Sequence, residues 1–270
     1  MVRPAARDRA AREASSVAGK LWWLTALGVA AALLFALATL PPQLFAGRLA
    51  RFGVAAVEYS GSVWSGAATG LSWRGATLGD LRWRIAPGAL LRGRLGAHVV
   101  LARPDGSVES DVVASLGGEV RLQAVRLDLP VEAVSVLPVG LPKGWRGRAR
   151  ADLAELRLRQ GWPQSVRGTV DMDGLIAPPP RNTSIGSYHA VLPDPAAAAG
   201  ATAGLTAKVT DKEGPFAVDA RLTLAPDRSF LLDGTLAPRG DTPQALRRSL
   251  ELLGPADATG RRQFSVSGTL

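Results

Sequence analysis

The side chains that could carry out chemistry in this sequence are few and widely separated. The chain has two histidines, His98 and His189, and no cysteine. Histidine is a common general base and metal ligand, and cysteine supplies thiolate nucleophiles and zinc ligands. Neither histidine belongs to an H-E-x-x-H sequence or has a cluster of carboxylates beside it in the sequence. We therefore expect both to be ordinary strand or loop residues, with no metal site and no cofactor.

Paired carboxylates are the remaining source of acid and base chemistry. The closest pairs are Asp152 with Glu155 and Asp171 with Asp173. Residues two apart on a strand point to the same face, so Asp171 and Asp173 would share the solvated face. The nucleophile sequence G-x-S-x-G and the phosphate-binding sequence G-x-x-x-x-G-K-[ST] do not occur. We expect no catalytic residues, and a protein that is not an enzyme.

The elements that would position these side chains are β-strands. Apolar and polar residues alternate in 119–129, 149–159, 166–173, 205–210, 216–224, 230–236 and 264–270. Glycine, proline and aspartate separate these stretches, as turns require. The pattern predicts a mostly β protein with a curved, mainly antiparallel sheet. We favour one continuous sheet over a domain boundary near 178–184, because strands of the same character flank that stretch.

Three stretches break the alternation and predict short helices. They are 87–91, 130–137 and 241–253, and we expect the last to begin with Asp241 or Thr242 as its cap. One internal echo is also present. The stretches 230–236 and 264–270 share the pattern F-x-x-x-G-T-L, which we interpret as neighbouring strands with the same bulged glycine.

The stretch 21–40 is hydrophobic except for Thr25, Gly28 and Thr39. A helix of this length covers about 30 Å, the hydrocarbon thickness of a bilayer. We predict a transmembrane anchor that includes Leu21, Trp22, Trp23, Leu33, Leu34, Phe35 and Leu40. More basic residues precede than follow the stretch, which places 1–20 in the cytoplasm as a short tail. The protein would span the membrane once, and the residues after the anchor would lie in the periplasm if the cell is bacterial.

A cleaved signal peptide is the alternative to this anchor, because Ala36-Leu37-Ala38 has the form of a cleavage site. The hydrophobic region of a signal peptide is usually about 7–15 residues, which is shorter than this stretch. After the anchor, 41–53 would be a membrane-proximal segment whose apolar side rests on the bilayer. That side contains Leu44, Phe45, Leu49 and Phe52, with Arg48 and Arg51 beside them. The residues 54–270 would form the periplasmic β domain.

The net charge of +9 does not indicate nucleic-acid binding. The arginines are dispersed through alternating segments and form no block of five, so they are typical of a solvated strand face. The tryptophans are more informative, because Trp64, Trp73 and Trp83 lie close together in the sequence. We favour burial in the sheet core, since each ring removes a large apolar area from water. A partner-facing aromatic surface is the alternative.

The order and spacing of one set of residues along the chain are informative. The set starts with Gly61, Trp64, Gly66, Leu81, Trp83, Pro87 and Leu90. It continues through Gly140-Leu-Pro142, Gly147, Gly186, Tyr188, Leu252-Leu-Gly254, Gly260, Phe264 and Gly268. In these residues the chain resembles the protein N (general secretion pathway protein N) family of the bacterial type II secretion system. The resemblance implies an accessory inner-membrane component that helps export folded proteins across the outer membrane. It implies no catalytic residues.

Two functions follow as hypotheses. The first is a non-enzymatic scaffold that tethers periplasmic secretion components, with the inner-membrane platform or the outer-membrane secretin as partners. An exposed sheet edge could bind such a partner by adding a strand. The alternative is a periplasmic lipid-binding module, because a long sheet with one apolar face can curve into a trough.

Overall fold

The computed structural model describes residues 43–90, 93–115, 117–134, 144–194, 204–240, 242–251 and 254–269. The predicted cytoplasmic tail and anchor lie outside these ranges, as do Gly140-Leu-Pro142 and Leu252-Leu253. None of the helices within these ranges has the length and hydropathy needed to cross a membrane.

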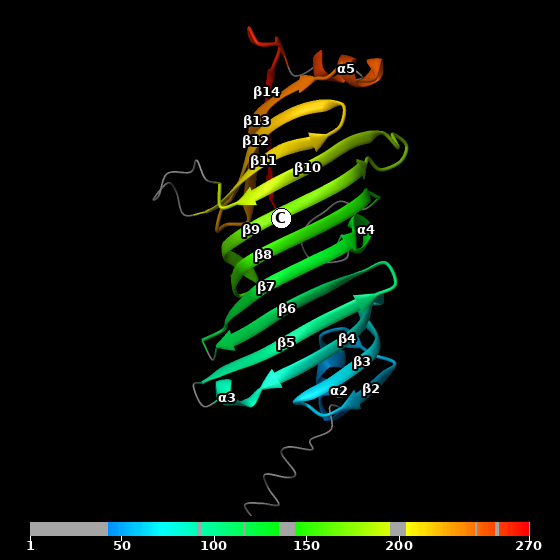
Figure 1. Cartoon of the computed structure of the whole chain (residues 1–270), viewed down its shortest axis with the longest axis vertical. Helices are drawn as coiled ribbons and strands as arrows, with labels where there is room; N and C mark the ends of the chain where they lie inside the picture. The colour runs from blue at the N-terminus through cyan, green and yellow to red at the C-terminus, as the bar shows by residue number, and fades with distance from the viewer. Residues whose placement is uncertain are drawn as a thin grey trace, which may run out of the picture.

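The described residues form one sheet of 14 strands, and every pairing in it is antiparallel (Figure 1). The strands follow the order of the chain, except that β1 and β2 both pair with β3. Their bounds are Val54–Ala55 (β1), Glu58–Gly61 (β2), Ser65–Trp73 (β3), Ala76–Ala86 (β4), Arg94–Arg103 (β5), Gly106–Ser115 (β6), Glu119–Pro130 (β7), Arg146–Arg159 (β8), Trp162–Ile176 (β9), Ser184–Leu192 (β10), Leu205–Glu213 (β11), Phe216–Leu224 (β12), Ser229–Pro238 (β13) and Arg262–Thr269 (β14). The mostly β fold and the continuous sheet are confirmed.

The two faces of the sheet differ in polarity, as the alternation predicts. Leu81, Leu101, Val108 and Leu127 are successive cross-strand partners on one face, which we call the apolar face. On the opposite face, the polar face, Glu109, Arg126 and Asp152 are partners in the same way. Because residues directly opposite each other share a face, the register carries both patterns across the sheet.

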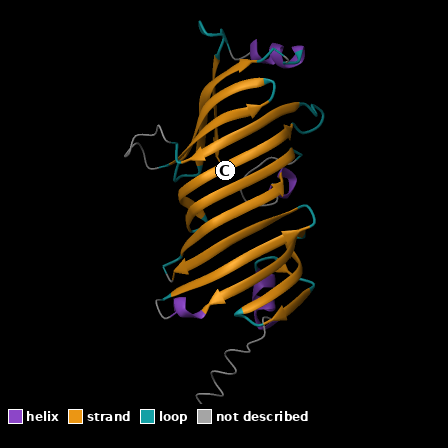
Figure 2. Ribbon diagram, in the orientation of Figure 1, coloured by secondary structure: helices purple, strands orange, loops and turns teal. Residues whose placement is uncertain are grey.

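The core lies on the apolar face under a short helix. Val131, at the start of α4 (Val131–Val134), is 2% exposed and packs with Ala149 and Leu175. Most other residues of the apolar face are half-buried. Only short helices accompany the sheet in the described part of the chain (Figure 2).

The helices agree with the sequence in place, within the residues that the structure describes. They are α2 (Gln43–Arg51), α3 (Pro87–Leu90), α4 and α5 (Gln244–Glu251). Of the two expected caps, Asp241 lies outside the described residues, and the hydroxyl of Thr242 donates to the carbonyl oxygen of Pro215. Thr242 thereby ties the start of α5 to the turn between β11 and β12.

Candidate interaction surface

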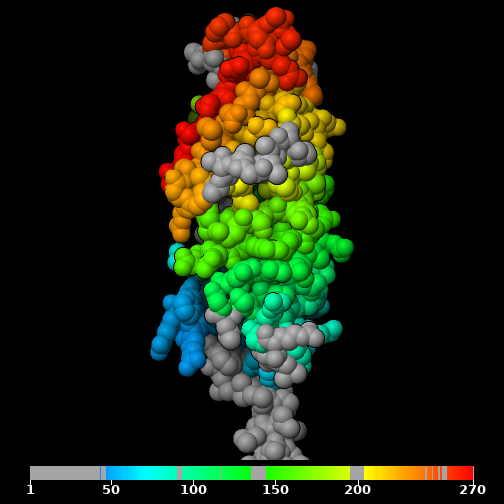
Figure 3. Space-filling view, turned by 90° about the vertical axis from the view of Figure 1, so that its left-hand side faces the viewer, coloured from blue at the N-terminus to red at the C-terminus, as the bar shows by residue number. Residues whose placement is uncertain are grey.

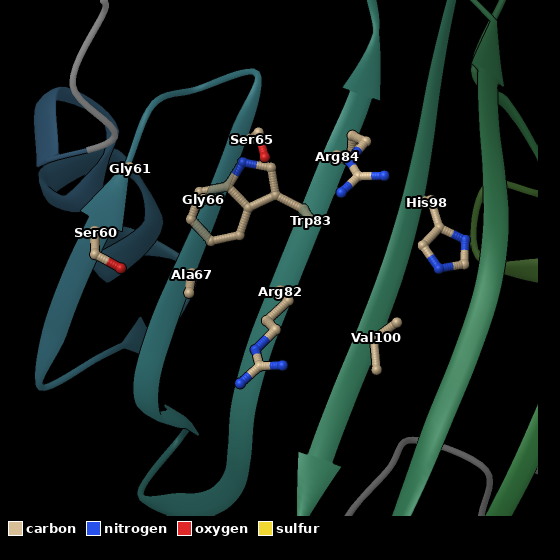
Figure 4. Close-up of a pocket in the computed structure, with 10 residues that line it drawn as sticks. All are labelled: Ser60, Gly61, Ser65, Gly66, Ala67, Arg82, Trp83, Arg84, His98 and Val100. Carbon is tan, nitrogen blue, oxygen red and sulfur yellow. The ribbon is translucent and has the colours of Figure 1, made fainter.

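The resemblance residues near the N-terminus meet where β2, β3 and β4 lie side by side. Trp83 of β4 is the cross-strand partner of Gly66 of β3, and its indole reaches across toward Gly66 (Figure 4). A Cβ atom on Gly66 would lie 2.5 Å from Cζ2 of Trp83, so only glycine leaves room for the ring. The indole Nε1 of Trp83 donates to the carbonyl oxygen of Val63 at 2.9 Å. The ring therefore holds the turn between β2 and β3 against β4.

The turn itself depends on a second glycine. Gly61 has a φ of +82°, and a Cβ atom there would lie 2.5 Å from the carbonyl oxygen of Ser65. The amide of Ile85 in β4 donates to the carbonyl oxygen of Trp64 at 2.6 Å. We refer to Gly61, Trp64, Gly66 and Trp83 together as the N-terminal clamp.

Two more resemblance residues and the third tryptophan extend this region. Leu81 is the partner of the buried Ala68 on the apolar face, and Pro87 begins α3. Trp73 donates from Nε1 to the carbonyl oxygen of Phe52 at 3.2 Å, and the guanidinium of Arg74 lies 5.0 Å from its ring centroid. All three tryptophans are half-buried. The rings of Trp73 and Trp83 thus contact their own chain, which differs from both a fully buried core and a free aromatic surface.

A shallow groove of about 410 Å³ lies beside the N-terminal clamp (Figure 4). Arg82, Arg84 and His98 line it from the polar face, together with Ala67 and Val100. Both arginines are exposed. Such a groove suits an acidic side chain of a partner, because guanidinium groups bind carboxylates through charge-assisted hydrogen bonds.

The second group of resemblance residues lies in β10, far from the clamp. Gly186 has a φ of +105° at an irregular point of the ladder, and a Cβ atom there would lie 2.4 Å from the carbonyl oxygen of Glu213. Tyr188 packs against the core cluster of Val131, and its hydroxyl donates to the carbonyl oxygen of Ile185 at 2.7 Å. Burial raises the pKa of the Tyr188 hydroxyl, and the nearby Asp211 raises it further.

Gly254 and Gly268 have separate positions at the C-terminal end. The carbonyl oxygen of Gly254 accepts a hydrogen bond from Nε of Arg262 at 2.9 Å. Gly268 is the partner of Phe230, and Gly234 is the partner of Phe264. The ladder between β13 and β14 has no register shift, so the predicted bulged glycine is wrong. The shared pattern instead sets each phenylalanine opposite a glycine of the neighbouring strand.

Ion pairs between side chains of different strands lie on the polar face. Nδ1 of His189 lies 2.9 Å from Oδ1 of Asp171, and Nζ of Lys212 lies 3.0 Å from the same oxygen. Asp173 contacts Lys212 at 3.3 Å and Nη1 of Arg150 at 2.9 Å. His98 has a similar partner, because its Nδ1 lies 2.8 Å from Oδ1 of Asp111. Both histidines are strand residues, as expected, but the sequence did not reveal carboxylates that are contributed by neighbouring strands.

These contacts do not make a metal centre. No group of three metal-ligating side chains occurs among the residues described. Burial acts to raise the pKa of Asp171, but hydrogen bonds from His189 and Lys212 outweigh it and hold this pKa below its ordinary value. Asp171 is therefore a charged, ion-paired residue, which makes it a poor general acid near neutral pH.

We expect the Asp171→Asn substitution to weaken the dependence of stability on acidic pH. A carboxylate whose pKa is lowered on folding stabilises the folded state above its unfolded pKa of about 4, and this contribution is lost as the pH falls through the lower folded pKa. The midpoint of thermal unfolding should therefore fall less between about pH 5 and pH 2 in the variant. Circular dichroism of the full chain in detergent measures it. Glu213→Gln, at an exposed residue outside this cluster, is the control; an unchanged acid slope in Asp171→Asn would contradict the assignment.

Comparison with known proteins identifies relatives over most of the chain. The family model described as "Type II secretion system (T2SS), protein N" matches residues 53–265. The chain is 25% identical over 227 residues to the type II secretion system protein N of Vibrio cholerae serotype O1. The aligned region covers 81% of this chain and 86% of the relative. The proteins of the same name from Pectobacterium carotovorum subsp. carotovorum and Aeromonas hydrophila are 24% identical over 222 residues and 26% identical over 216 residues. They cover 81% and 78% of this chain, and 85% and 82% of their own lengths. No solved structure matches the chain significantly.

Proposed function

Because the chain belongs to the type II secretion system protein N family, we propose that it is a non-catalytic, inner-membrane-anchored scaffold of that system. Its role is to hold periplasmic parts of the apparatus in place while folded proteins are exported across the outer membrane. The histidines and their carboxylate partners support this proposal, because they form ion pairs across strands.

The shape of the sheet is the observation that carries the proposal. Thirteen strands follow one another from β1 to β14, so at about 4.8 Å per strand the sheet extends for about 58 Å. In Figure 1, α2 lies at one end of the long axis and α5 lies at the other. A rigid sheet of this length can keep two partners at a fixed separation.

The composition of α2 supports a position near the bilayer for one end of the sheet. Leu49 is 38% exposed and Phe52, just after the helix, is 74% exposed. Arg48 and Arg51 lie in the last turn of α2. Exposed apolar side chains beside basic ones are typical of a segment that rests on anionic lipid headgroups.

The proposal is tested by exchanging the anchor in a deletion strain. We expect deletion to reduce the export of secreted proteins into the medium, and the full chain to restore it. A chain in which an unrelated single-pass anchor replaces 21–40 should also restore export, whereas a chain that carries a cleaved signal peptide in place of 1–40 should not. Purification of the tagged full chain in detergent should retain other secretion components. Unchanged export in the deletion strain, together with no association in detergent, would contradict the scaffold.

The apolar face supports lipid binding as a second candidate function. Side chains such as Leu101, Val108 and Leu127 are only half-buried although they lie next to one another across three strands. A trough formed by such residues could hold an acyl chain. Lipid that stays bound to the full chain in native mass spectrometry would favour this function, and a chain free of lipid would exclude it.

A further inference from the structure

The last strand of the sheet has an edge without the usual protection against pairing. β14 pairs with β13, and the described part of the chain places no strand on its other side. Its sequence RQFSVSGT contains one charged residue, Arg262, and no proline. The ladder to β13 is regular, and Val266 is 50% exposed. Proteins usually protect such edges with charges, prolines or bulges, because unpaired N–H and C=O groups recruit other strands.

The opposite edge of the sheet is interrupted, whereas β14 is one continuous strand. It consists of two short pieces, β1 with two residues and β2 with four, which pair with different parts of β3. The adjoining helix α2 reaches it, because Nε2 of Gln43 donates to the carbonyl oxygen of Tyr59 at 3.2 Å. In Figure 3 the C-terminal residues, in red, lie along one margin of the molecule. The unprotected edge is therefore a particular property of the C-terminal end.

We propose that the free edge of β14 binds an extended segment of another secretion component as an additional antiparallel strand. This inference rests on the proposed scaffold function and names the chemistry of the partner. The partner segment carries an aromatic residue and a glycine four positions apart, with uncharged residues between them.

The pairing of β13 with β14 shows why this pattern fits. Phe230 lies opposite Gly268, Leu232 opposite Val266, and Gly234 opposite Phe264. A partner in the same register on the free edge would set its aromatic residue opposite Gly268 and its glycine opposite Phe264. The ring of Phe230 already lies over Gly268, where a Cβ atom would be 2.7 Å from Cε1. Strands on either side of β14 are about 9.6 Å apart, so the glycine between them lets the two rings meet as an aromatic pair.

The membrane geometry selects another protein over a second copy of this chain. β14 itself carries the required pattern, with Phe264 and Gly268 four positions apart. Antiparallel pairing of two β14 strands would turn the second sheet around, however, and put the two α2 helices at opposite ends of a joined sheet about 120 Å long. In the scaffold proposed above, the sheet extends from α2 away from the bilayer, so the second α2 would then lie far from the membrane that anchors its own chain. A segment of a different component has no such constraint.

A fluorescent peptide with the sequence of 262–269 is the probe for the edge. It should bind the full chain in detergent with one saturable site, and replacing its phenylalanine by alanine should weaken binding by about tenfold. Alternate N–H groups of a strand face its partner. Methylation of the backbone nitrogens at one alternate set of positions should therefore abolish binding, whereas methylation of the other set should leave it. These variants change only the peptide, so the fold of the protein is untouched.

The register is tested by disulfide formation, since the chain has no cysteine of its own. Val266→Cys should cross-link to a peptide with cysteine at its valine position, because these residues lie directly opposite each other within the range of a disulfide. Ser267→Cys, at a residue that is also exposed to solvent, should not cross-link to that peptide. Absence of peptide binding, or equal loss with both methylated sets, overturns the proposal. Rapid Val266→Cys homodimers without peptide also overturn it, in favour of a second copy. None of these results alters the anchor-exchange test, so the two proposals can fail separately.

Discussion

Replacement of Trp83 by alanine is expected to lower the free energy of unfolding by about 3 kcal/mol. The substitution removes the ring that packs on Gly66 and the hydrogen bond from its Nε1 to the carbonyl oxygen of Val63. Guanidinium unfolding of the full chain in detergent measures the change. Trp83→Phe keeps most of the ring but loses the donor, so it should cost only about 1 kcal/mol. Equal losses in the two variants would contradict the packing role.

The other side of the same contact provides an independent test. Gly66→Ala places a Cβ atom 2.5 Å from the Trp83 ring and 2.7 Å from the carbonyl oxygen of Ser60, so we expect it to destabilise the chain by about 2 kcal/mol. Gly88→Ala is the matched control, because a Cβ atom there meets nothing within 4 Å. In the Trp83→Ala background, Gly66→Ala should cost less, since part of the clash has been removed. If the losses of stability caused by Gly66→Ala and Trp83→Ala simply add, the two residues do not interact and Gly66 is not part of the clamp.

The sequence predicted the C-terminal half of the sheet better than the N-terminal half. The stretch 216–224 alternates clearly and is strand β12 with the same bounds. β3, with the sequence SGAATGLSW, does not alternate and contains residues that disfavour strands. It is a strand because of the residues that it packs against in neighbouring strands. Ala68, on the apolar face, is 1% exposed, and Gly66 leaves room for the ring of Trp83. Small residues selected by a large cross-strand partner leave no periodic signal of their own.

The candidate site was predictable in its members but not in their contacts. The resemblance singled out Gly66 with Trp83, yet only the register shows that they are partners. The same holds for His189 and Asp171, which are distant in sequence and paired across β9 and β10. The F-x-x-x-G-T-L echo was correctly assigned to neighbouring strands, but its cause is a phenylalanine opposite a glycine and not a bulge. Register depends on the turns and on packing across the whole sheet, so a single stretch of sequence does not define it.

Replacement of Tyr188 by alanine is expected to cost about 3 kcal/mol of stability, a loss similar to that expected for Trp83→Ala. The ring packs on the cluster of Val131, Ala149 and Leu175, and the hydroxyl donates to the carbonyl oxygen of Ile185. Tyr188→Phe retains the packing and should cost only about 1 kcal/mol. The same unfolding measurement compares the two variants, and a larger loss in Tyr188→Phe than in Tyr188→Ala would contradict a packing role for the ring.

The dependence of stability on alkaline pH tests whether the hydroxyl of Tyr188 is buried, in addition to the packing of its ring. Burial raises the pKa of its hydroxyl in the folded state, with a further increase from Asp211. A group whose pKa is raised on folding contributes stability below its unfolded pKa, about 10 for tyrosine, and this contribution is lost as the pH rises through the folded pKa. Stability should therefore fall above about pH 10 less steeply in Tyr188→Phe than in the unsubstituted chain. Absorbance titration of the phenolate should show a step above the ordinary pKa of tyrosine, and this step should vanish in Tyr188→Phe. Absence of such a step in the unsubstituted chain would mean that Tyr188 is accessible to water, and the core around Val131 would then have to open on that side.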